Sequence, residues 1–263
     1  MDSLCLRGAI HFEAFNSHAA NHFRPGKFGM RAAKGALEDI SIDPITFEPM
    51  LLTIGNTRPK GICGSGLIIM VGVMFEIGLI NSLGKYEREL DTPRLRGNNG
   101  IWEFVLAWAD ETQIDRDIVL TEIDIENLIR AKGAIYSGCV TLLEEVGMGI
   151  QDLDRIILAG GFGSYVDLEK AMTIGLLPEI DPAGITFIGN GSLSGARMSA
   201  LTNRIRQDVV KVTRMMTSFE LSETVSYMNN YVAALFLPHT DMNLFPKLKT
   251  RLEKRKTAGR SIH

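Results

Sequence analysis

The sequence predicts an α/β fold in which short buried strands pack against helices. Two observations carry this prediction. Residues 155–159 form a short apolar run before a glycine-rich turn at 160–163, and residues 185–188 do the same before a second turn at 189–191. Each turn is followed by a helical stretch, and strands that alternate with helices are typical of layered α/β domains. At 263 residues the chain is long enough to bury a sizeable core.

Short strands come first along the readable part of the chain. Residues 35–54 show strand-like patterns, and turns at Pro44 and Pro49 interrupt them. The small-residue segment 61–66 then precedes an apolar stretch. This stretch predicts a buried helix that ends near Ile80.

A polar stretch separates this helix from the next strands. Residues 81–100 carry several glycines and a proline and are predicted to form a loop. The apolar runs at 101–108 and 118–120 are candidate strands.

A long helix follows these strands. Thr121 and Asp124 have the spacing of a capping box, in which the threonine oxygen accepts a free backbone N–H. The helix is expected to reach Glu145. Gly133 and Gly138 each lower helix stability by roughly 1 kcal/mol. They make sense if another backbone or a ligand lies close to them.

The remaining pattern completes the α/β alternation. We expect helices at 167–174 and from residue 193 onward. A last strand near 218–221 and a helix up to residue 237 follow. The basic run at 247–260 is interpreted as a solvated helix or a frayed tail.

Composition excludes several classes of protein. The net charge of −3 and the pI of about 6.0 give no basic face for nucleic acid. The longest apolar stretch, residues 67–80, is interrupted by Glu76 and is shorter than the roughly 20 residues that span a bilayer. Residues 1–23 lack the pattern of a signal peptide. We therefore expect a cytoplasmic protein that binds neither nucleic acid nor membrane.

The cysteines suggest reduced thiols. Cys5, Cys63 and Cys139 are odd in number and form no C-x-x-C, so neither a disulfide framework nor a cysteine-rich metal site is expected. Cys63 precedes the apolar helix, where a helix N-terminus lowers a thiol pKa and favours a nucleophile. No histidine lies near it in sequence, so packing is the preferred interpretation.

The strongest chemical signal is the turn that contains Gly160, Gly161 and Gly163. Glycines at a strand end let a ligand approach the backbone, and the next helix N-terminus offers N–H groups to phosphate or ribose oxygens. A tight turn alone explains such a loop equally well. The turn at 189–191 fails the dinucleotide fingerprint because Ser194 occupies the third glycine position. The chain contains no Walker A sequence.

Eight segments in one order resemble a known family. They are Gly29-Met-Arg-Ala-Ala33 with Gly35-Ala36, Gly61-Ile-Cys-Gly-Ser-Gly-Leu-Ile68, Leu128 to Ile135, Ile157 to Tyr165, Gly175-Leu-Leu-Pro178, Phe187-Ile-Gly-Asn190, Gly195-Ala-Arg197 and Ala233-Ala-Leu-Phe236. Together they resemble the C-terminal region of the reductive activators of corrinoid-dependent methyltransferases and corrinoid iron–sulfur proteins. These activators belong to the superfamily of acetate and sugar kinases, heat-shock-70 proteins and actin.

The resemblance implies a fold and a nucleotide site. The fold is an RNase H-like lobe of an actin-like ATPase, a mixed sheet flanked by helices, in which two such lobes clamp ATP with Mg²⁺. The helix that carries Lys132 resembles the second connecting helix, so Lys132 is a candidate neighbour of adenine or ribose; a solvated lysine is the alternative. The expected nucleotide-binding residues are Gly160, Gly161, Gly163, Ser164, Lys132, Gly189 and Asn190.

Two features of the family are missing from the sequence. The chain has neither the Asp-x-Gly-Thr phosphate loop of each lobe nor the four-cysteine domain that holds a 2Fe–2S cluster. The expected segment upstream of Gly29 is only echoed by residues 8–13. We interpret the chain as a fragment or a degenerate reading frame that has negligible ATP turnover by itself, with no metal ligands of its own.

The resemblance also implies domain limits and a function. Residues 1–28 are a poorly defined segment, residues 29–240 the C-terminal part of the ATPase domain, and residues 241–263 a basic tail. The implied activity is ATP-dependent reduction of a corrinoid protein or corrinoid-dependent methyltransferase from Co(II) to Co(I), for which this chain supplies the adenosine-binding lobe. A small-molecule kinase and a non-catalytic interaction module are the alternatives. A homodimer is an open alternative for the assembly.

Overall fold

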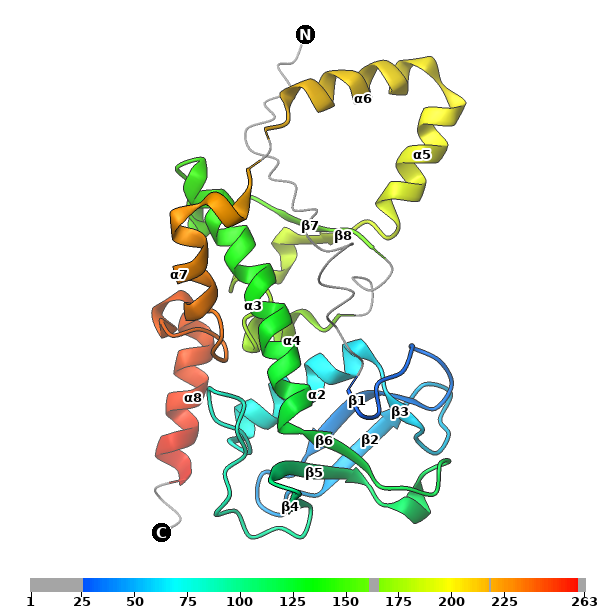
Figure 1. The fold of residues 1–263 in the computed structure, drawn as a ribbon, viewed down its shortest axis with the longest axis vertical. Coiled ribbons are helices and arrows are strands. Elements are labelled where there is room, and N and C mark those ends of the chain that lie inside the picture. Colours follow the sequence, from blue (N-terminus) through cyan, green and yellow to red (C-terminus); the bar gives the residue numbers. More distant parts are fainter. Residues whose placement is uncertain (1–25, 161–165, 218, 260–263) are drawn as a thin grey trace.

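The computed structural model describes residues 26–160, 166–217 and 219–259 of the chain. Its strands form three small sheets rather than one (Figure 1). The first has the order β2-β1-β3, with β1 and β2 antiparallel and β3 parallel to β1; the second has the order β4-β5-β6 and is antiparallel. The third pairs β7 and β8 in parallel. The strands are β1 (Ala36–Ile42), β2 (Pro49–Thr53), β3 (Gly61–Ile62), β4 (Leu95–Asn98), β5 (Ile101–Ala107), β6 (Ile118–Thr121), β7 (Ile156–Leu158) and β8 (Ile185–Phe187).

Two helices organise the first half. Helix α2 (Gly64–Ile77) packs against β1, and α3 (Glu122–Glu145) follows β6 directly (Figure 1). The other helices are α4 (Leu168–Thr173), α5 (Gly191–Leu201), α6 (Asn203–Met215), α7 (Val225–Ala233) and α8 (Pro246–Gly259). Short 3₁₀ turns lie at Ala109–Glu111, Ile150–Asp152, Pro182–Gly184, Leu221–Glu223 and Met242–Leu244.

Small residues just before α2 and in its first turn permit close backbone packing. A Cβ atom at Gly66 would lie 2.2 Å from the carbonyl oxygen of Leu37 on β1, and one at Gly61 would lie 2.4 Å from that of Phe28. Glycine is the residue type that permits such approaches. Helix α2 ends at Ile77, and the next residue, Gly78, has a φ of 78°, the left-handed conformation that caps a helix. The predicted helix is confirmed, and its end lies three residues before the expected Ile80.

Helix α3 begins as the sequence predicts. The Thr121 hydroxyl accepts from the backbone N–H of Asp124 at 3.2 Å, and the Asp124 carboxylate accepts from the Thr121 N–H at 3.0 Å. The predicted end at Glu145 is also confirmed. Gly133 has a packing reason, because a Cβ there would lie 3.3 Å from the Ala234 carbonyl oxygen, just beyond α7.

Two predictions about local structure are wrong. The predicted loop at 81–100 contains β4, whose Leu95 is buried opposite Phe104 of β5 while its other residues are polar and more exposed. A polar strand at a sheet edge gives no apolar alternation to detect. The predicted strand at 218–221 does not form in its described residues, 219–221, which have no strand neighbour and lead into a 3₁₀ turn at Leu221.

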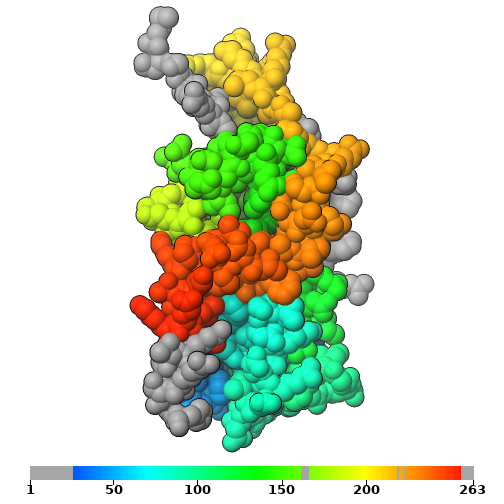
Figure 2. Space-filling model, turned by 90° about the vertical axis from the view of Figure 1, so that its left-hand side faces the viewer, coloured from blue at the N-terminus to red at the C-terminus, as the bar shows by residue number. Residues whose placement is uncertain are grey.

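The basic run near the C-terminus forms a docked helix. In α8, Leu248 is buried, Arg251 is paired with Glu76 of α2 at 3.2 Å, and Arg255 donates to the Glu76 carbonyl oxygen at 2.6 Å. The frayed-tail interpretation is therefore wrong for residues 246–259. Figure 2 shows α7 and α8, in orange and red, as a continuous band between green residues above and cyan residues below.

The buried apolar side chains divide unequally. One large cluster joins β1, β5, β6, α2 and α3 with residues around α7 and α8. A small second cluster lies under the β7–β8 sheet and consists of Ala171, Met172, Leu177 and Ile185. In the described part of the chain, no helix is long and apolar enough to cross a bilayer.

Candidate functional site

The two glycine turns lie side by side at one sheet edge. Strands β7 and β8 are parallel and in register from Ile156 opposite Ile185 to Leu158 opposite Phe187. Both therefore end at the same edge, where the Gly160 N–H donates to the Gly189 carbonyl oxygen at 2.7 Å. This proximity follows from the apolar runs that the sequence shows before each turn. Gly161, Gly163 and Ser164 lie outside the described residues.

The backbone is open at both turns. Gly160 has a φ of 113° and Gly189 a φ of 62°, conformations that favour glycine. A Cβ atom at either position would meet no described atom within 4 Å. The neighbouring Gly191 differs, because a Cβ there would lie 3.1 Å from the Ile188 side chain. Among the described residues, no side chain therefore fills the space next to the backbone at Gly160 and Gly189.

Helix α5 starts at the second turn. The Asn190 side chain accepts from the Leu193 N–H at 2.9 Å and caps the helix, whose first residue is Gly191. The amino end of a helix carries partial positive charge and attracts anions such as phosphate. Helix α5 begins two residues before the predicted start at residue 193, because the Asn190 side chain caps it at Gly191.

Lys132 lies in the interior. Its side chain is fully buried, and Nζ donates to the carbonyl oxygens of Phe236 and Pro238, the latter at 2.6 Å. Burial lowers the pKa of the ammonium group to about 7, although the two carbonyl oxygens favour its charged form. The solvated-lysine alternative is therefore wrong. Its hydrogen bonds go to the turn after α7 and not to the glycine turns, and a role beside adenine or ribose stays a prediction.

Sequence reasoning missed the polar groups around Lys132. Tyr136 lies one turn further along α3, its ring centroid is 5.5 Å from that of His239, and His239 Nδ1 accepts from the Asp241 N–H at 2.9 Å. Burial and the nearby Lys132 lower the pKa of His239. The Tyr136 hydroxyl is buried and has no hydrogen-bond partner among the described residues. The spacing of Lys132 and Tyr136 places them on one helix face and could have revealed this cluster.

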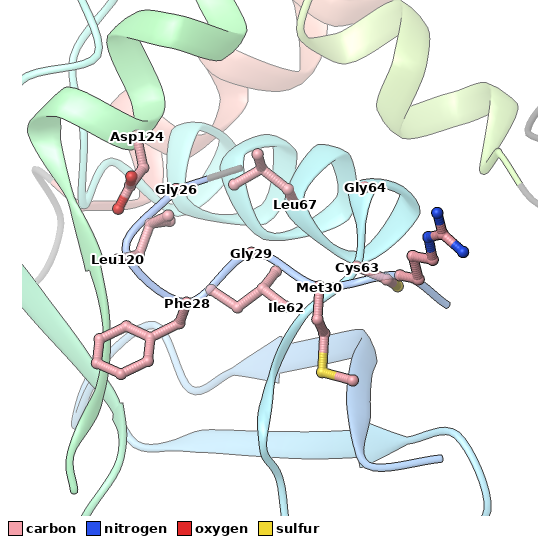
Figure 3. Close-up of a pocket in the computed structure, with 11 residues that line it drawn as sticks. Gly26, Phe28, Gly29, Met30, Ile62, Cys63, Gly64, Leu67, Leu120 and Asp124 are labelled. Carbon is pink, nitrogen blue, oxygen red and sulfur yellow. The ribbon is translucent and has the colours of Figure 1, made fainter. Parts of the chain in front are cut away.

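A separate cavity of about 370 Å³ lies in the first half (Figure 3). Its wall is mostly apolar, and Asp124 and Arg31 are its charged lining residues. Figure 3 shows Asp124 at one end and Cys63 at the other. The Asp124 carboxylate accepts from the Lys27 N–H at 3.2 Å as well as from Thr121. The cavity is lined by Gly26, Phe28, Gly29, Met30, Arg31, Ile62, Cys63, Gly64, Leu67, Leu120 and Asp124.

The thiol at the Cys63 end of this cavity is engaged by neighbouring groups. Cys63 is almost fully buried, and its thiol contacts the Leu37 carbonyl oxygen at 3.1 Å and the Ser65 hydroxyl at 3.3 Å. This environment fits the packing interpretation of Cys63. Within residues 26–160, 166–217 and 219–259, no group of three His, Cys, Asp or Glu side chains is arranged to hold a metal ion.

The comparison with known families decides the identity of the fold. A family model described as the C-terminal domain of RACo, the ASKHA domain, matches residues 25–249. The chain belongs to this family. The mixed α/β architecture of an ASKHA domain is therefore confirmed, with its strands distributed over three small sheets.

The names of two relatives of this RACo C-terminal domain refer to corrinoid proteins or their activation. The corrinoid activation enzyme RamQ of Eubacterium limosum is 33% identical over 213 residues, which is 78% of this chain and 35% of that protein. A reductase of the Co(II) methylated amine-specific corrinoid protein of Methanosarcina barkeri is 33% identical over 120 residues, 45% of this chain and 22% of that protein. The chain spans about a third or less of the length of these relatives.

One solved structure extends the likeness to three dimensions. A reductive activator for the corrinoid iron–sulfur protein superposes with a TM-score of 0.78 at 43% identity. The match covers 86% of this chain and 36% of that one. Sequence and structure thus indicate the same family for nearly the whole chain.

Proposed function

We propose that this chain is the nucleotide-binding part of an activator that uses ATP to reduce a corrinoid protein from Co(II) to Co(I). The pair of open glycine turns at Gly160 and Gly189 is the observation that carries the proposal. Membership of the RACo C-terminal domain family and the names of the relatives support it. The relatives are longer than this chain, so the reaction as a whole is proposed for the longer protein.

Nucleotide binding is proposed to use both the backbone of the two glycine turns and the start of helix α5. The backbones at Gly160 and Gly189 leave room for the adenosine moiety, and the Asn190-capped start of α5 presents the positive end of a helix. Gly161, Gly163 and Ser164 are proposed to continue the same site. Such a site positions the nucleotide, while Mg²⁺ and the phosphate-loop carboxylates would complete it in the longer protein.

The electron is proposed to come from outside this chain. A reduced 2Fe–2S cluster in another domain would give one electron to the cobalt, which turns Co(II) into Co(I). This chain contributes the free energy of nucleotide binding and a surface for the corrinoid protein. Neither role requires a catalytic side chain within residues 26–259.

Gly189→Asn tests the nucleotide site in a full-length activator that carries this chain. Asparagine tolerates a φ of 62°, so the turn is retained while a side chain fills the open space. We expect ATP affinity, measured by calorimetry, to fall by about tenfold or more, which is about 1.4 kcal/mol. Melting should stay unchanged.

Gly147→Asn is the matched control. Gly147 has a φ of 70°, and a Cβ there also meets no described atom within 4 Å, but it lies after α3. Its substitution should leave ATP affinity unchanged. Normal affinity in Gly189→Asn would contradict the proposed site.

Gly161→Val extends the test to the first turn. A β-branched side chain would occupy space beside the nucleotide, so lost affinity with unchanged melting supports the site. Near-normal affinity with a lower melting temperature would instead assign that glycine to the turn alone.

A further inference from the structure

Glu76, near the end of α2, joins three helices. Its carboxylate forms ion pairs with Lys170 of α4 and, at 3.2 Å, with Arg251 of α8, and it accepts from the Thr173 hydroxyl of α4 at 3.2 Å. The side chains of Glu76 and Lys170 are each 20% exposed. Partly buried ion pairs are screened less by water and salt than pairs on an open surface. These contacts therefore hold α4 and α8 against the end of α2.

Helix α8 adds contacts of its own to both neighbours. Arg255 donates to the carbonyl oxygens of Phe75 at 3.2 Å and of Glu76 at 2.6 Å, both at the end of α2. Arg251 also forms an ion pair with Glu169 of α4. Helix α8 thus bridges α2 and α4, and the Glu76 carboxylate lies at the centre of the bridge.

Helix α4 supports the sheet that carries the two glycine turns. It supplies Ala171 and Met172, two of the four side chains in the small buried cluster under β7 and β8. Ile185 at the start of β8 belongs to the same cluster, and Ile156 and Leu158 of β7 pack against it. Because this cluster is small, few other buried side chains among the described residues hold the sheet in place. The position of α4 therefore sets the position of the strands that lead into both turns.

The charge of Glu76 balances two cations, Lys170 on α4 and Arg251 on α8. A glutamine at this position would keep the size and one oxygen acceptor but would lose the charge between them. Two cations that lose a shared counter-ion repel each other, and a partly buried cation without a partner is unfavourable. Among the described residues, Lys170 has no other ion-pair partner. Loss of the Glu76 charge should therefore shift α4 away from α8.

We propose that Glu76 is a positioning residue for the nucleotide site and that it couples ATP binding to the docking of α8. The inference rests on the proposed function and adds a means of regulation to it. The route runs from α8 through Glu76 to α4, and from α4 through the small buried cluster to β7 and β8. Each step is a contact between described residues of this chain, so none of them depends on the surface of another molecule or on the rest of a longer polypeptide.

Coupling of this kind is reciprocal. If docked α8 favours the arrangement that binds ATP, bound ATP must favour docked α8 by the same factor. An ion pair that only stabilises the fold would give α8 no such dependence on the nucleotide. Amide exchange of α8 with and without ATP therefore distinguishes a positioning role from a purely structural one.

Variants of the central ion pair test the proposal in a full-length activator that carries this chain. E76Q and K170M each remove one charge of the pair, whereas K170R keeps both. We expect ATP affinity, measured by calorimetry, to fall by about fivefold or more in E76Q and K170M and by less than about twofold in K170R. If E76Q melts below the assay temperature, the comparison of K170M with K170R decides.

E103Q is the matched control. Glu103 of β5 is buried and also pairs with two basic residues, Arg96 of β4 at 3.0 Å and Lys27 at 3.4 Å. The substitution removes the same charge in a different sheet. It should lower the melting temperature and leave ATP affinity unchanged.

Hydrogen exchange measures the coupling itself. In the parent protein, saturating ATP should slow amide exchange in residues 246–259 by about fivefold or more. This effect should be lost in E76Q and K170M. ATP is saturating for every variant, so that weaker binding cannot imitate lost coupling.

Three results would overturn the inference alone. They are ATP affinity that E76Q and K170M leave unchanged, α8 exchange that ATP does not alter in the parent protein, and an equal loss of ATP affinity in E103Q. The last result would assign the loss to general destabilisation. No ATP binding by the parent protein would overturn the proposed function and this inference with it.

Discussion

The first half of the molecule and the region around β7 and β8 use similar sequence patterns and reach different degrees of burial. Strands β5 and β6 lie in the large core, and Phe104 and Leu120 are fully buried there. In the parallel pair β7–β8, Ile157 is 58% exposed, and Ile188 just beyond β8 is 50% exposed. Parallel strands are usually covered on both faces. The first region therefore holds most of the buried apolar side chains of the described residues, and the second keeps apolar side chains exposed.

The largest effect should come from removing the amine of Lys132. Lys132→Ala leaves a cavity and deprives the Phe236 and Pro238 carbonyl oxygens of their donor, so we expect a loss of about 3–5 kcal/mol in the free energy of unfolding. Lys211→Ala on the exposed helix α6 should change this free energy by less than about 0.5 kcal/mol. Urea denaturation of both variants measures the difference, and equal effects would remove the contrast between the two regions.

Substitution of two glycines, one in the packed region and one in α5, should show the same contrast in stability with smaller effects. Gly175 has a φ of 74°, and a Cβ there would lie 2.2 Å from the Pro238 carbonyl oxygen, so Gly175→Ala should cost about 2–4 kcal/mol. Gly195 lies inside α5, where a Cβ meets no described atom within 4 Å. Gly195→Ala should instead be neutral or raise stability by up to about 1 kcal/mol through helix propensity. Thermal melting compares the two variants, and a destabilised Gly195→Ala would show that α5 is packed against other residues.

The pH dependence of stability tests whether Lys132 is buried as a weak base. Its folded-state pKa of about 7 lies below the ordinary value of 10.5, so between these values the unfolded chain binds a proton that the folded chain does not. Stability should rise with pH from about 7 to 9, by at most about 1.4 kcal/mol per unit. The window ends at about 9, because burial raises the pKa of Cys139 from 9.0 to about 11, and between these values this thiol makes stability fall as the pH rises. Lys132→Met should abolish the slope in urea titrations, and an unchanged slope would assign it to other groups.

The smallest contrast concerns two helix caps. Thr121→Ala removes half of the capping box of α3 in the core and should lower global stability by about 1 kcal/mol. Asn190→Ala removes the cap of the exposed helix α5, so its effect should be confined to faster amide hydrogen exchange in the first turn of that helix. A global loss in Asn190→Ala would show that α5 unfolds together with the core.

Local signals explain most of what the sequence predicted. The capping box at Thr121 fixed the start of α3, and the apolar runs located β5, β6, β7 and β8, because these features depend on near neighbours in the chain. The structure places Gly160 and Gly189 at a shared edge because β7 and β8 are parallel and in register. Strand β4 could not be predicted, because a polar strand at a sheet edge shows no alternation of apolar and polar residues.

Contacts between distant residues could not be predicted in the same way. Lys132 is held by carbonyl oxygens more than 100 positions away, and a lysine in a helix gives no sign of such partners. Likewise, Arg255 of α8 donates to the carbonyl oxygens at the end of α2, about 180 positions earlier in the chain. The basic composition of α8 gives no sign of this contact. The order of elements along the chain predicts contacts between neighbouring segments. It does not predict that Lys132 and Arg255 donate hydrogen bonds to the carbonyl oxygens of a distant turn and a distant helix end.

Helices α7 and α8 pack against the first half of the chain, and this determines what proteolytic cleavage of the chain would produce. Asn230 of α7 donates to the Thr141 hydroxyl at 3.0 Å and to the Glu144 carboxylate at 2.9 Å, and α8 binds α2 through Arg251 and Arg255. Helices α5 and α6 are exposed and rich in trypsin cleavage sites, and in the sequence they lie between the first half of the chain and these C-terminal helices. Cleavage within α6 would therefore yield two polypeptides that stay associated without a covalent link. The same position offers a place to divide the gene, so that two separately expressed pieces reassemble into one domain.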